Sequence, residues 1–488
     1  MNKPIRTMSI ACMLLFVALL VNSTYLQYLQ ADDLNSRNDN KRVRDAEFSR
    51  ERGAIVVGAT PVAESNEVDD EFEFQRTYPQ PLKYAHLTGY YSYTYGRAAV
   101  ELTENEVLSG SDPRMFVNRV VDLIGNSQPQ GGSVSLTIDP RAQTAAYDGL
   151  RALGENITGS VVALDPSTGG ILAMVSSPTY DPGVLSSHRF TAIQQAWERL
   201  QRDPSQPMLN RGIQEVYPPG STFKLVTAAA ALSSGQYEPE SLVPGQATLD
   251  LPETDTDLVN ESGTDCGGEK ISLTRALEVS CNVSFGWLGL TLGADAIGEQ
   301  AERFGFGSYY LDDLNGQVLS RFPEDPDDPQ TALSAIGQFD VAATPLQMAM
   351  VTAAIANDGT VMKPYLVDEV RSPDFEALDK TGPEAFRTSA VSSSVAQDLT
   401  QMMIEVVDRG TATTAQIPGI KVAGKTGTAQ SAPERPPYAW FVSFAPADNP
   451  EVAVAVLVED AGVARDAISG SGLAAPIAKR VMEAVVSQ

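Results

Sequence analysis

The chain has 488 residues, 43% of them hydrophobic, and a formal net charge of −27 at pH 7. It is too long for one ordinary domain, and its hydrophobic share supports large cores and excludes general disorder. So acidic a chain is not expected to bind nucleic acid, which needs a basic footprint, or to dock on anionic lipid. With only two histidines, neither a Ser-His-Asp triad nor a His-rich metal site is expected. A nucleophilic serine would need another base, and lysine is the leading choice.

The N-terminal segment predicts a membrane anchor. Two basic residues precede an apolar run from Ile10 to Val21, and the run continues amphipathically to Leu29. The strictly apolar part has the length of a signal peptide, but the whole run is long enough to span a bilayer. We expect an uncleaved anchor over residues 8–29, with residues 1–7 in the cytoplasm; a cleaved signal is the alternative. Both interpretations place the rest of the chain outside the cell membrane.

Residues 30–153 show no acid–base or nucleophilic spacing, and we expect a mixed, non-catalytic spacer domain that resembles a dimerisation domain. The expected elements are a charged stalk or helix over 32–51, a turn into a short strand over 52–57, an acidic loop or hairpin tip over 64–73, strand-like pieces over 84–100, a helix from Leu102 past Val107, and a linker over 126–132.

From Val134 onward the pattern becomes regular, and residues 154–488 are expected to form the second domain. Strands are followed by a block of helices, a meander of strands and a closing helix. This order predicts an α/β fold of the α+β type, with an antiparallel sheet flanked by helices. The expected elements are a strand over 134–138, a helix over 140–153, a hairpin over 159–164 and 170–175, helices over much of 191–355, an acidic, proline-rich loop over 321–329, strands over 420–428, 439–444 and 452–458, and a helix over 474–486.

Ser221 lies where a stretch rich in proline and glycine, Tyr217 to Gly220, meets a predicted buried helix over 223–232. Lys224 is one turn further along the same face. An amine therefore lies beside a hydroxyl at a helix N-terminus, where the dipole favours developing negative charge. Burial could lower the lysine pKa until the amine removes the serine proton. The alternative is a capping serine and a surface lysine, because a bare Ser-x-x-Lys arises by chance about once in a chain this long.

Two later motifs decide between these interpretations. Ser280-Cys281-Asn282 follows a predicted helix over 272–279, and Lys425-Thr426-Gly427-Thr428 lies on a predicted strand. Together with Ser221 and Lys224, their order and spacing are typical of penicillin-binding proteins and class A β-lactamases. Further segments resemble motifs of class B penicillin-binding proteins: Arg52-Gly53-Ala54-Ile55, Leu87-Thr88-Gly89-Tyr90, Leu108-Ser109-Gly110, Tyr180-Asp181-Pro182, Gly337-Gln338, Thr344-Pro345-Leu346-Gln347 and Ala439-Trp440-Phe441.

Over most of its length the chain thus resembles a class B penicillin-binding protein, of the penicillin-binding protein A type of actinobacteria. Tyr438 stands where many relatives have a histidine, and the Asp-Arg-Asn-Gly that often follows the Arg-Gly motif is absent. Neither departure touches the three motifs. The resemblance implies that residues 154–488 are a transpeptidase domain with a serine β-lactamase-like fold.

The resemblance implies that the chain is a peptidoglycan D,D-transpeptidase. For the residues of the three motifs it implies the following roles. Ser221 attacks the terminal D-Ala-D-Ala bond of a stem peptide, and Lys224 acts as the general base. Ser280 relays the proton to the leaving D-Ala, and Asn282 orients Lys224 and holds a substrate amide. The substrate carboxylate is bound by Lys425 and by the hydroxyls of Thr426 and Thr428, while Gly427 lets the substrate lie close to the strand. The backbone N–H groups of Ser221 and Thr428 form the oxyanion hole.

The same resemblance implies the partners. The acyl-enzyme passes to an amine of a second stem peptide, which crosslinks the cell wall, and β-lactams acylate and inhibit the enzyme. A separate glycosyltransferase and other cell-wall synthesis proteins are expected as partners. No cofactor or metal is expected, and a D,D-carboxypeptidase side activity is compatible with the same chemistry.

Other functions on the same fold are a β-lactamase, a β-lactam sensor and a wall-synthesis factor with an inactive site. A β-lactamase is typically a compact single domain with a glutamate that positions water, and no glutamate of this chain is placed in that role. A sensor would need several membrane spans and a cytoplasmic output domain. An inactive factor would not be expected to keep all three motifs complete.

Three cysteines are present, and Cys12 lies in the apolar N-terminal run. Cys266 and Cys281 could pair in an oxidising compartment, closing a loop that contributes roughly 3 kcal/mol. Two free thiols are an equal alternative at this stage.

Overall fold

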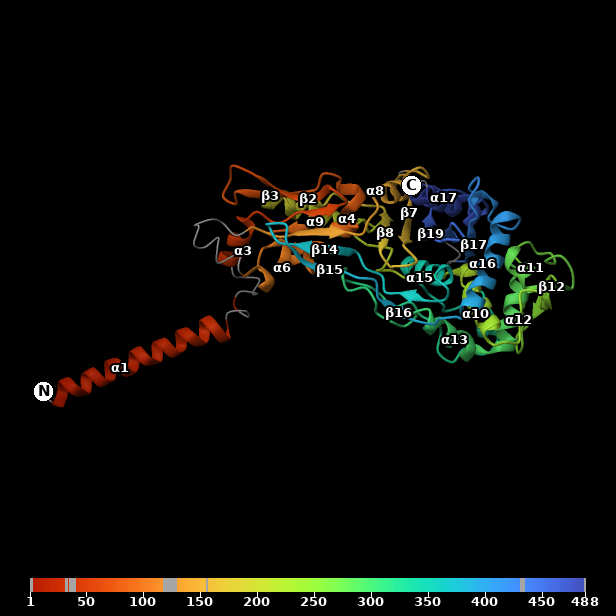
Figure 1. Ribbon diagram of the computed structural model, residues 1–488, viewed down its shortest axis with the longest axis horizontal. Helices are drawn as coiled ribbons and strands as arrows, with labels where there is room; N and C mark the ends of the chain where they lie inside the picture. Colours follow the sequence, from red (N-terminus) through yellow and green to blue (C-terminus); the bar gives the residue numbers. More distant parts are fainter. Residues whose placement is uncertain are drawn as a thin grey trace.

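The computed structural model describes residues 3–30, 34, 41–116, 130–154, 157–430 and 435–486. At the N-terminus, helix α1 (Lys3–Thr24) and a π-helical turn, η1 (Tyr25–Leu29), form one continuous rod that stands away from the folded body (Figure 1). The rod buries no residue against the protein, and it is long and apolar enough to cross a membrane. The predicted N-terminal helix is therefore present. Helix α3 (Lys41–Phe48) follows within the charged stretch.

A six-stranded sheet forms the core of the region next to the rod. Its strand order is β15-β14-β6-β1-β2-β3. The pairing of β1 with β6 is parallel, and the other pairings are antiparallel. Two of the six strands come from distant sequence, because β14 and β15 lie beyond residue 360. The strands are β1 (Ile55–Val57), β2 (Thr60–Glu67), β3 (Phe74–Thr77), β6 (Ser133–Leu136), β14 (Val367–Arg371) and β15 (Ala377–Lys380).

A buried cluster of charges joins this sheet to the short helix α5 (Val100–Thr103). The Nε atoms of Arg52 and Arg76 each lie 2.6 Å from a different oxygen of Glu101, and Tyr78 donates a third hydrogen bond to that carboxylate. Burial alone would raise the pKa of Glu101, but the two guanidinium groups lower it. The arginine of the Arg52-Gly53 motif therefore anchors this region of the fold.

A five-stranded antiparallel sheet, with the order β17-β18-β19-β7-β8, forms the second core. Every residue of β18 is buried. Helices α8 and α17 pack on each other and on this sheet, and α15 and α16 also contact it. The elements are β7 (Thr158–Leu164), β8 (Ile171–Ser177), β17 (Ala423–Ala429), β18 (Tyr438–Ala445), β19 (Val452–Asp460), α8 (Pro140–Arg151), α15 (Pro345–Ala356), α16 (Ser393–Asp408) and α17 (Ala475–Val486).

A helical layer lies beyond the edge strand β17 (Figure 1). Its centre is α10 (Lys224–Ser233), in which every residue from Lys224 to Leu232 is buried. Helices α12, α13 and α16 surround it. The remaining elements of the region are α11 (Leu273–Glu278), α12 (Asn282–Leu292), α13 (Ala294–Arg303), α14 (Asp328–Ser334) and the short strands β9 (Leu242–Pro244), β10 (Thr248–Asp250), β11 (Asp257–Val259) and β12 (Lys270–Ser272). Helix α9 (Phe190–Arg202) lies outside this layer, where its Ile193 and Ala196 pack with Ala85 and Tyr90.

These layers confirm the predicted α+β architecture, with an antiparallel sheet flanked by helices. The strand-like interpretation of residues 84–88 is wrong, because they belong to helix α4 (Pro81–Thr88). Pro81 suits the first turn of a helix, and Gly89, with φ 74°, ends it. The glycine-rich and tyrosine-rich composition concealed this short helix. Only β4 (Tyr91–Ser92) and β5 (Gly96–Arg97) are strands there.

Other differences are smaller. The helix predicted past Leu102 is divided between α5 and α6 (Asn105–Leu108). The acidic stretch 64–73 is a hairpin whose first strand, β2, runs to Glu67. Helix α16 and strands β13 (Val361–Met362) and β16 (Ala385–Arg387) were not predicted. Most of the predicted linker, residues 126–129, lies outside the described residues.

Candidate active site

Ser221 lies in a short 3-10 turn, η4 (Gly220–Thr222), directly before α10. The turn begins with Gly220 at φ 53°, a conformation that favours glycine. The N–H of Gly220 donates to the Gly337 carbonyl at 2.9 Å, and a Cβ on Gly337 would lie 2.2 Å from the Gly220 oxygen. Because both positions are glycines, the η4 turn and the segment around Gly337 can meet backbone to backbone. Ser221 is at the predicted junction between loop and helix.

The second motif is a tight connection between two helices. Helix α11 ends at Glu278, and α12 begins at Asn282. Ser280 between them has φ 60°, which L residues rarely adopt. This left-handed residue turns the chain sharply, so that Ser280 and Asn282 present side chains to one point in the interior. Such backbone strain is typical of functional sites.

Lys224, Ser280, Asn282 and Lys425 form one continuous hydrogen-bond network. Lys224 Nζ donates to the Ser280 carbonyl at 2.8 Å and to Asn282 Oδ1 at 2.7 Å, and it lies 3.2 Å from Ser280 Oγ. Lys425 Nζ donates to the same Ser280 hydroxyl at 2.9 Å. The Ser280 hydroxyl thus bridges two amines that the sequence separates by 201 positions, as the difference between 425 and 224 shows.

Both lysine side chains of the network are buried completely. Burial lowers the pKa of Lys425 to about 7, and the Glu261 carboxylate acts in the opposite direction. Burial also lowers the pKa of Lys224 far below its usual range, and the positive charge of Lys425 lowers it further. Both effects favour the neutral form of Lys224, which is the protonation state that a general base needs.

Ser221 faces a cavity of about 500 Å³ that Asn282 and Thr428 also line. Glu261 and Phe339 form part of its rim. Within the described residues, the Ser221 hydroxyl makes no hydrogen bond to Lys224, whose amine is engaged with Ser280 and Asn282. The arrangement leaves the hydroxyl open to a ligand in the cavity, with the buried amines behind it.

The third motif runs along β17, the edge strand of the five-stranded sheet. Thr428 lines the Ser221 cavity, whereas Thr426 is mostly buried and shares a 2.7 Å hydrogen bond with the hydroxyl of Thr411. A Cβ on Gly427 would lie 3.0 Å from the Pro219 carbonyl and 3.0 Å from the Thr222 methyl. The close approach at Gly427 is thus to the turn that carries Ser221, in addition to any approach by a ligand.

Glu261 is a residue that sequence reasoning missed. It is exposed at the cavity rim, and its charge favours the protonated form of both Lys224 and Lys425. We predict that Glu261→Gln moves the whole pH profile of acylation to lower pH, because both lysines then lose their protons more easily. The measurement is the second-order rate constant for acylation by a fluorescent penicillin between pH 5 and 9.

Asp265→Asn is the matched control, because it removes the same charge from the same loop without a comparable influence on the two lysines. Its profile should coincide with that of the unmodified protein. An equal shift in both variants would mean that net charge, and not the position of Glu261, is responsible.

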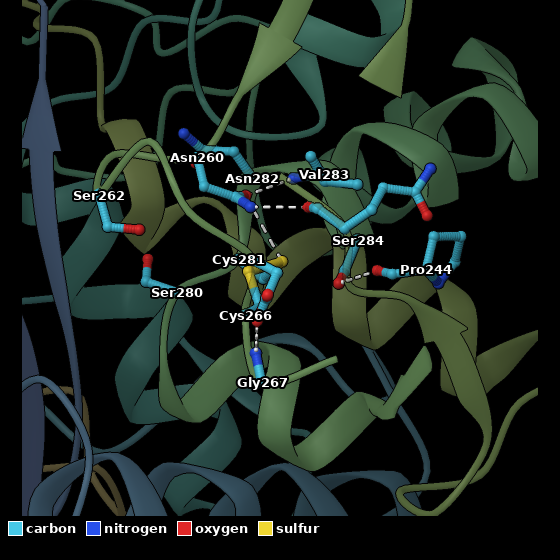
Figure 2. The surroundings of a disulfide bond; sticks show 12 residues. Pro244, Asn260, Ser262, Cys266, Gly267, Ser280, Cys281, Asn282, Val283 and Ser284 are labelled. Carbon is cyan, nitrogen blue, oxygen red and sulfur yellow. Dashed lines mark hydrogen bonds between the residues drawn. A yellow bond between two sulfur atoms is a disulfide. The ribbon is translucent and has the colours of Figure 1, made fainter. Parts of the chain in front are cut away.

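Cys266 and Cys281 form a disulfide, which leaves exposed Cys12 as the free cysteine (Figure 2). Of the two alternatives open from the sequence, the structure has the bonded pair. The bond ties the loop before β12 to the residue between Ser280 and Asn282, so it restrains the second motif directly.

Sequence reasoning also missed Val259, Asn260 and Thr411, which support the motif residues and belong to no short motif. Gly337 was named for its resemblance to a family segment, but its contact with Gly220 was not predicted. Residues of these types are common in loops and strand ends, so their local sequence carries no signal of their contacts.

Comparisons with known proteins agree with this arrangement. The penicillin binding protein transpeptidase domain matches residues 159–483, and the penicillin binding protein A dimerisation domain matches residues 52–134. The chain is 43% identical to peptidoglycan D,D-transpeptidase PbpA of Mycolicibacterium smegmatis over 498 aligned residues, which cover 100% of both chains. The protein of the same name from Mycobacterium tuberculosis is also 43% identical, over 100% of this chain and 99% of its own.

Solved structures of penicillin-binding protein A from M. tuberculosis superpose well. The acyl-enzyme complex with ceftriaxone has a TM-score of 0.87 and 42% identity, and the match covers 91% of this chain and 100% of that one. The acyl-enzyme complex with penicillin G has a TM-score of 0.84 and 42% identity, over 90% of this chain and 100% of that one. The resemblance inferred from the motifs is thereby confirmed over both folded regions.

Proposed function

This chain belongs to the penicillin-binding protein transpeptidase family, as a class B member, and from that membership we propose that Ser221 is its acylated nucleophile. The protein is a peptidoglycan D,D-transpeptidase that β-lactams acylate. The observation that carries the assignment of Ser221 is its position over a cavity of about 500 Å³ beside the buried Lys224–Ser280–Lys425 network.

Lys224 is the proposed general base. A neutral amine has two N–H bonds, and these suit its two shortest contacts, to the Ser280 carbonyl and Asn282 Oδ1. The lone pair then remains to accept the proton of Ser221, directly or through the Ser280 hydroxyl. Attack of Ser221 Oγ on the D-Ala-D-Ala carbonyl forms the ester, and the proton passes through Ser280 to the departing D-Ala nitrogen.

Lys425 and the hydroxyls of Thr426 and Thr428 are the proposed contacts of the substrate's terminal carboxylate. A carboxylate near Lys425 would raise the lowered pKa of that amine and so hold it charged. The backbone N–H groups of Ser221 and Thr428 are the proposed oxyanion hole. The first N–H groups of a helical turn have no partner within the turn, and Thr428 lies on the edge strand that borders the same cavity.

Transfer completes the proposed reaction. An amine of a second stem peptide attacks the Ser221 ester, gives its proton to Lys224 through the same network, and releases the crosslinked product. The mechanism uses side chains and backbone alone. A D,D-carboxypeptidase side activity would follow if water replaced the amine.

The rod over residues 3–29 is the proposed single-pass anchor, with its N-terminus in the cytoplasm and the active site outside. We propose the domain boundaries given above, residues 30–153 for the spacer and 154–488 for the transpeptidase domain. A separate glycosyltransferase and other cell-wall synthesis proteins are the proposed partners.

The proposed function is tested by giving the protein a donor peptide ending in D-Ala-D-Ala together with an amine acceptor. The expected result is a crosslinked product, its formation blocked by prior exposure to penicillin. The penicillin adduct should last far longer than the acyl-enzyme of a β-lactamase does. Rapid release of hydrolysed penicillin would favour the β-lactamase alternative. Stable acylation without any crosslinking would favour a sensor.

A further inference from the structure

Helix α12 begins at the catalytic motif without a cap of its own. Its N-cap residue is Cys281, whose sulfur belongs to the disulfide and makes no cap hydrogen bond to the helix. The first N–H groups of a helix need partners from elsewhere. Here the N–H of Val283 donates to Oδ1 of Asn260 at 3.1 Å. The cap is therefore supplied by a residue 23 positions earlier in the chain.

Asn260 is held rigidly from both ends of its amide. The side chain is 4% exposed, and its Nδ2 donates to the carbonyls of Gln246 and Thr264 at 2.9 and 3.0 Å. Its Oδ1 also lies 3.5 Å from the sulfur of Cys281, a contact without a hydrogen bond because a disulfide sulfur carries no proton. Figure 2 shows Asn260 beside the disulfide, with its amide directed at the start of α12. Every donor of the amide is thus paired inside the protein.

The backbone next to Asn260 orients the catalytic amide. Nδ2 of Asn282 donates to the carbonyl of Val259 at 3.0 Å. This contact directs the nitrogen of the Asn282 amide away from Lys224 and leaves Oδ1 to accept from Nζ at 2.7 Å. A reversed amide would instead bring an NH₂ group against Nζ, where it would repel the protonated amine or take up the lone pair of the neutral one. The carbonyl of Val259 therefore decides which end of Asn282 faces the proposed base.

We infer that Asn260 is a positioning residue for acyl transfer: it caps α12 and holds the Val259 carbonyl that orients Asn282 toward Lys224. The inference rests on the proposed roles of Lys224 and Asn282. The Asn260 amide is fully hydrogen-bonded to groups inside the protein. Asn260 therefore acts through Asn282 and makes no contact with reacting atoms. The disulfide restrains the other side of the same turn and leaves the orientation of the amide to the Val259–Asn260 pair.

The test is a double-mutant cycle on acylation by a fluorescent penicillin, with Asn260→Ala and Asn282→Ala made singly and together in the full chain. Asn260→Ala should lower the second-order rate constant by up to about 100-fold, the loss expected from a misplaced catalytic group. In the Asn282→Ala background the same change should lower this rate constant by less than about threefold, because no Asn282 amide remains to be oriented. The rising limb of the Asn260→Ala pH profile should also move to lower pH, since Lys224 loses an oxygen that favours its protonated form.

Asn210→Ala is the matched control. Asn210 is also 4% exposed and hydrogen-bonded at both ends of its amide, to Ser176, Gly212 and the His86 carbonyl, outside the Ser221 cavity. Its loss should lower the melting temperature without moving the pH profile. If Asn260→Ala does not fold, Asn260→Ser replaces it in the double-mutant cycle. The serine hydroxyl can still donate a hydrogen bond to one of the two carbonyls that Asn260 holds, those of Gln246 and Thr264.

Two results would overturn the inference. One is an Asn260 variant that folds and acylates within twofold of the unmodified protein. The other is an equal loss in the presence and absence of the Asn282 side chain, which would mark Asn260 as a purely structural residue. Both results count only if the unmodified protein is labelled at Ser221. If the unmodified protein is not labelled, the proposed function itself has failed, and that outcome is distinct from failure of the inference about Asn260.

Discussion

Ser221→Ala is expected to abolish both covalent labelling by a fluorescent penicillin and formation of crosslinked peptide. The methyl group has no oxygen with which to form the ester, and the remaining hydroxyl of the network, on Ser280, accepts hydrogen bonds from two lysines behind the cavity wall. Loss of a nucleophile leaves only binding and oxyanion stabilisation, so we expect a decrease of at least about 10⁴-fold. The measurement is a denaturing gel with mass spectrometry of the intact protein.

Ser262→Ala is the control and should label normally. Ser262 lies on the neighbouring loop, and among the described residues its hydroxyl has hydrogen bonds with Thr264 alone. The melting temperature of Ser221→Ala should stay close to that of the unmodified protein, since Ser221 makes no hydrogen bond in the described part of the chain. An adduct that survives the Ser221→Ala change, at the same mass and rate, would assign the nucleophile to another residue.

Lys224→Met is expected to lower the rate constant of acylation by about 10²- to 10⁴-fold, the usual contribution of a general base. Methionine has a similar length and suits a fully buried site, but it has no lone pair basic enough to take the Ser221 proton. Lys421→Met, at an exposed lysine before β17, is the control and should acylate normally. Lys224→Met should not recover activity at higher pH. Unchanged acylation in Lys224→Met would mean that another group is the base.

The pH dependence of the unmodified protein follows from the two lysines. Lys224 must be neutral, so acylation should rise with pH as this amine, whose pKa burial lowers, loses its proton. Lys425 should be charged to attract the carboxylate, so acylation should fall above its pKa of about 7 in the free protein. Lys425→Arg keeps its charge throughout this range and should remove the falling limb alone. A falling limb that persists in Lys425→Arg would belong to another group.

Much of the fold could be predicted from local pattern. The hairpin of β7 and β8, helix α8, the strands β17 to β19 and the closing helix were all predicted, because alternating or helical periodicity continued through each of them. Helix α4 was missed, since its eight residues are fewer than a periodic pattern needs and its tyrosines favour strands. Strands near β1 and β6 were predicted, but their pairing into a six-stranded sheet was not. Strands β14 and β15 join that sheet from more than 200 positions away, and no local rule selects such a partner.

The family and the candidate residues of the site could be predicted from the sequence alone. Ser221, Lys224, Ser280, Asn282 and Lys425 stand in motifs whose order and spacing are rare by chance, and the comparisons confirm the family that these motifs indicated. Their pattern could be recognised because it depends on residue type and on short spacings. That is the information which a linear chain carries.

Only the tertiary structure decided how these residues are held. The disulfide was an even choice until Cys266 and Cys281 were brought together, and nothing local marked Glu261 as a neighbour of both lysines. The Val259 carbonyl reaches Asn282, and the Asn260 amide reaches the N–H of Val283, each across 23 positions. The burial of a lysine, the charge of its neighbours and the orientation of an amide all depend on contacts between segments that are distant in the chain. Local sequence does not predict which distant segments will be in contact.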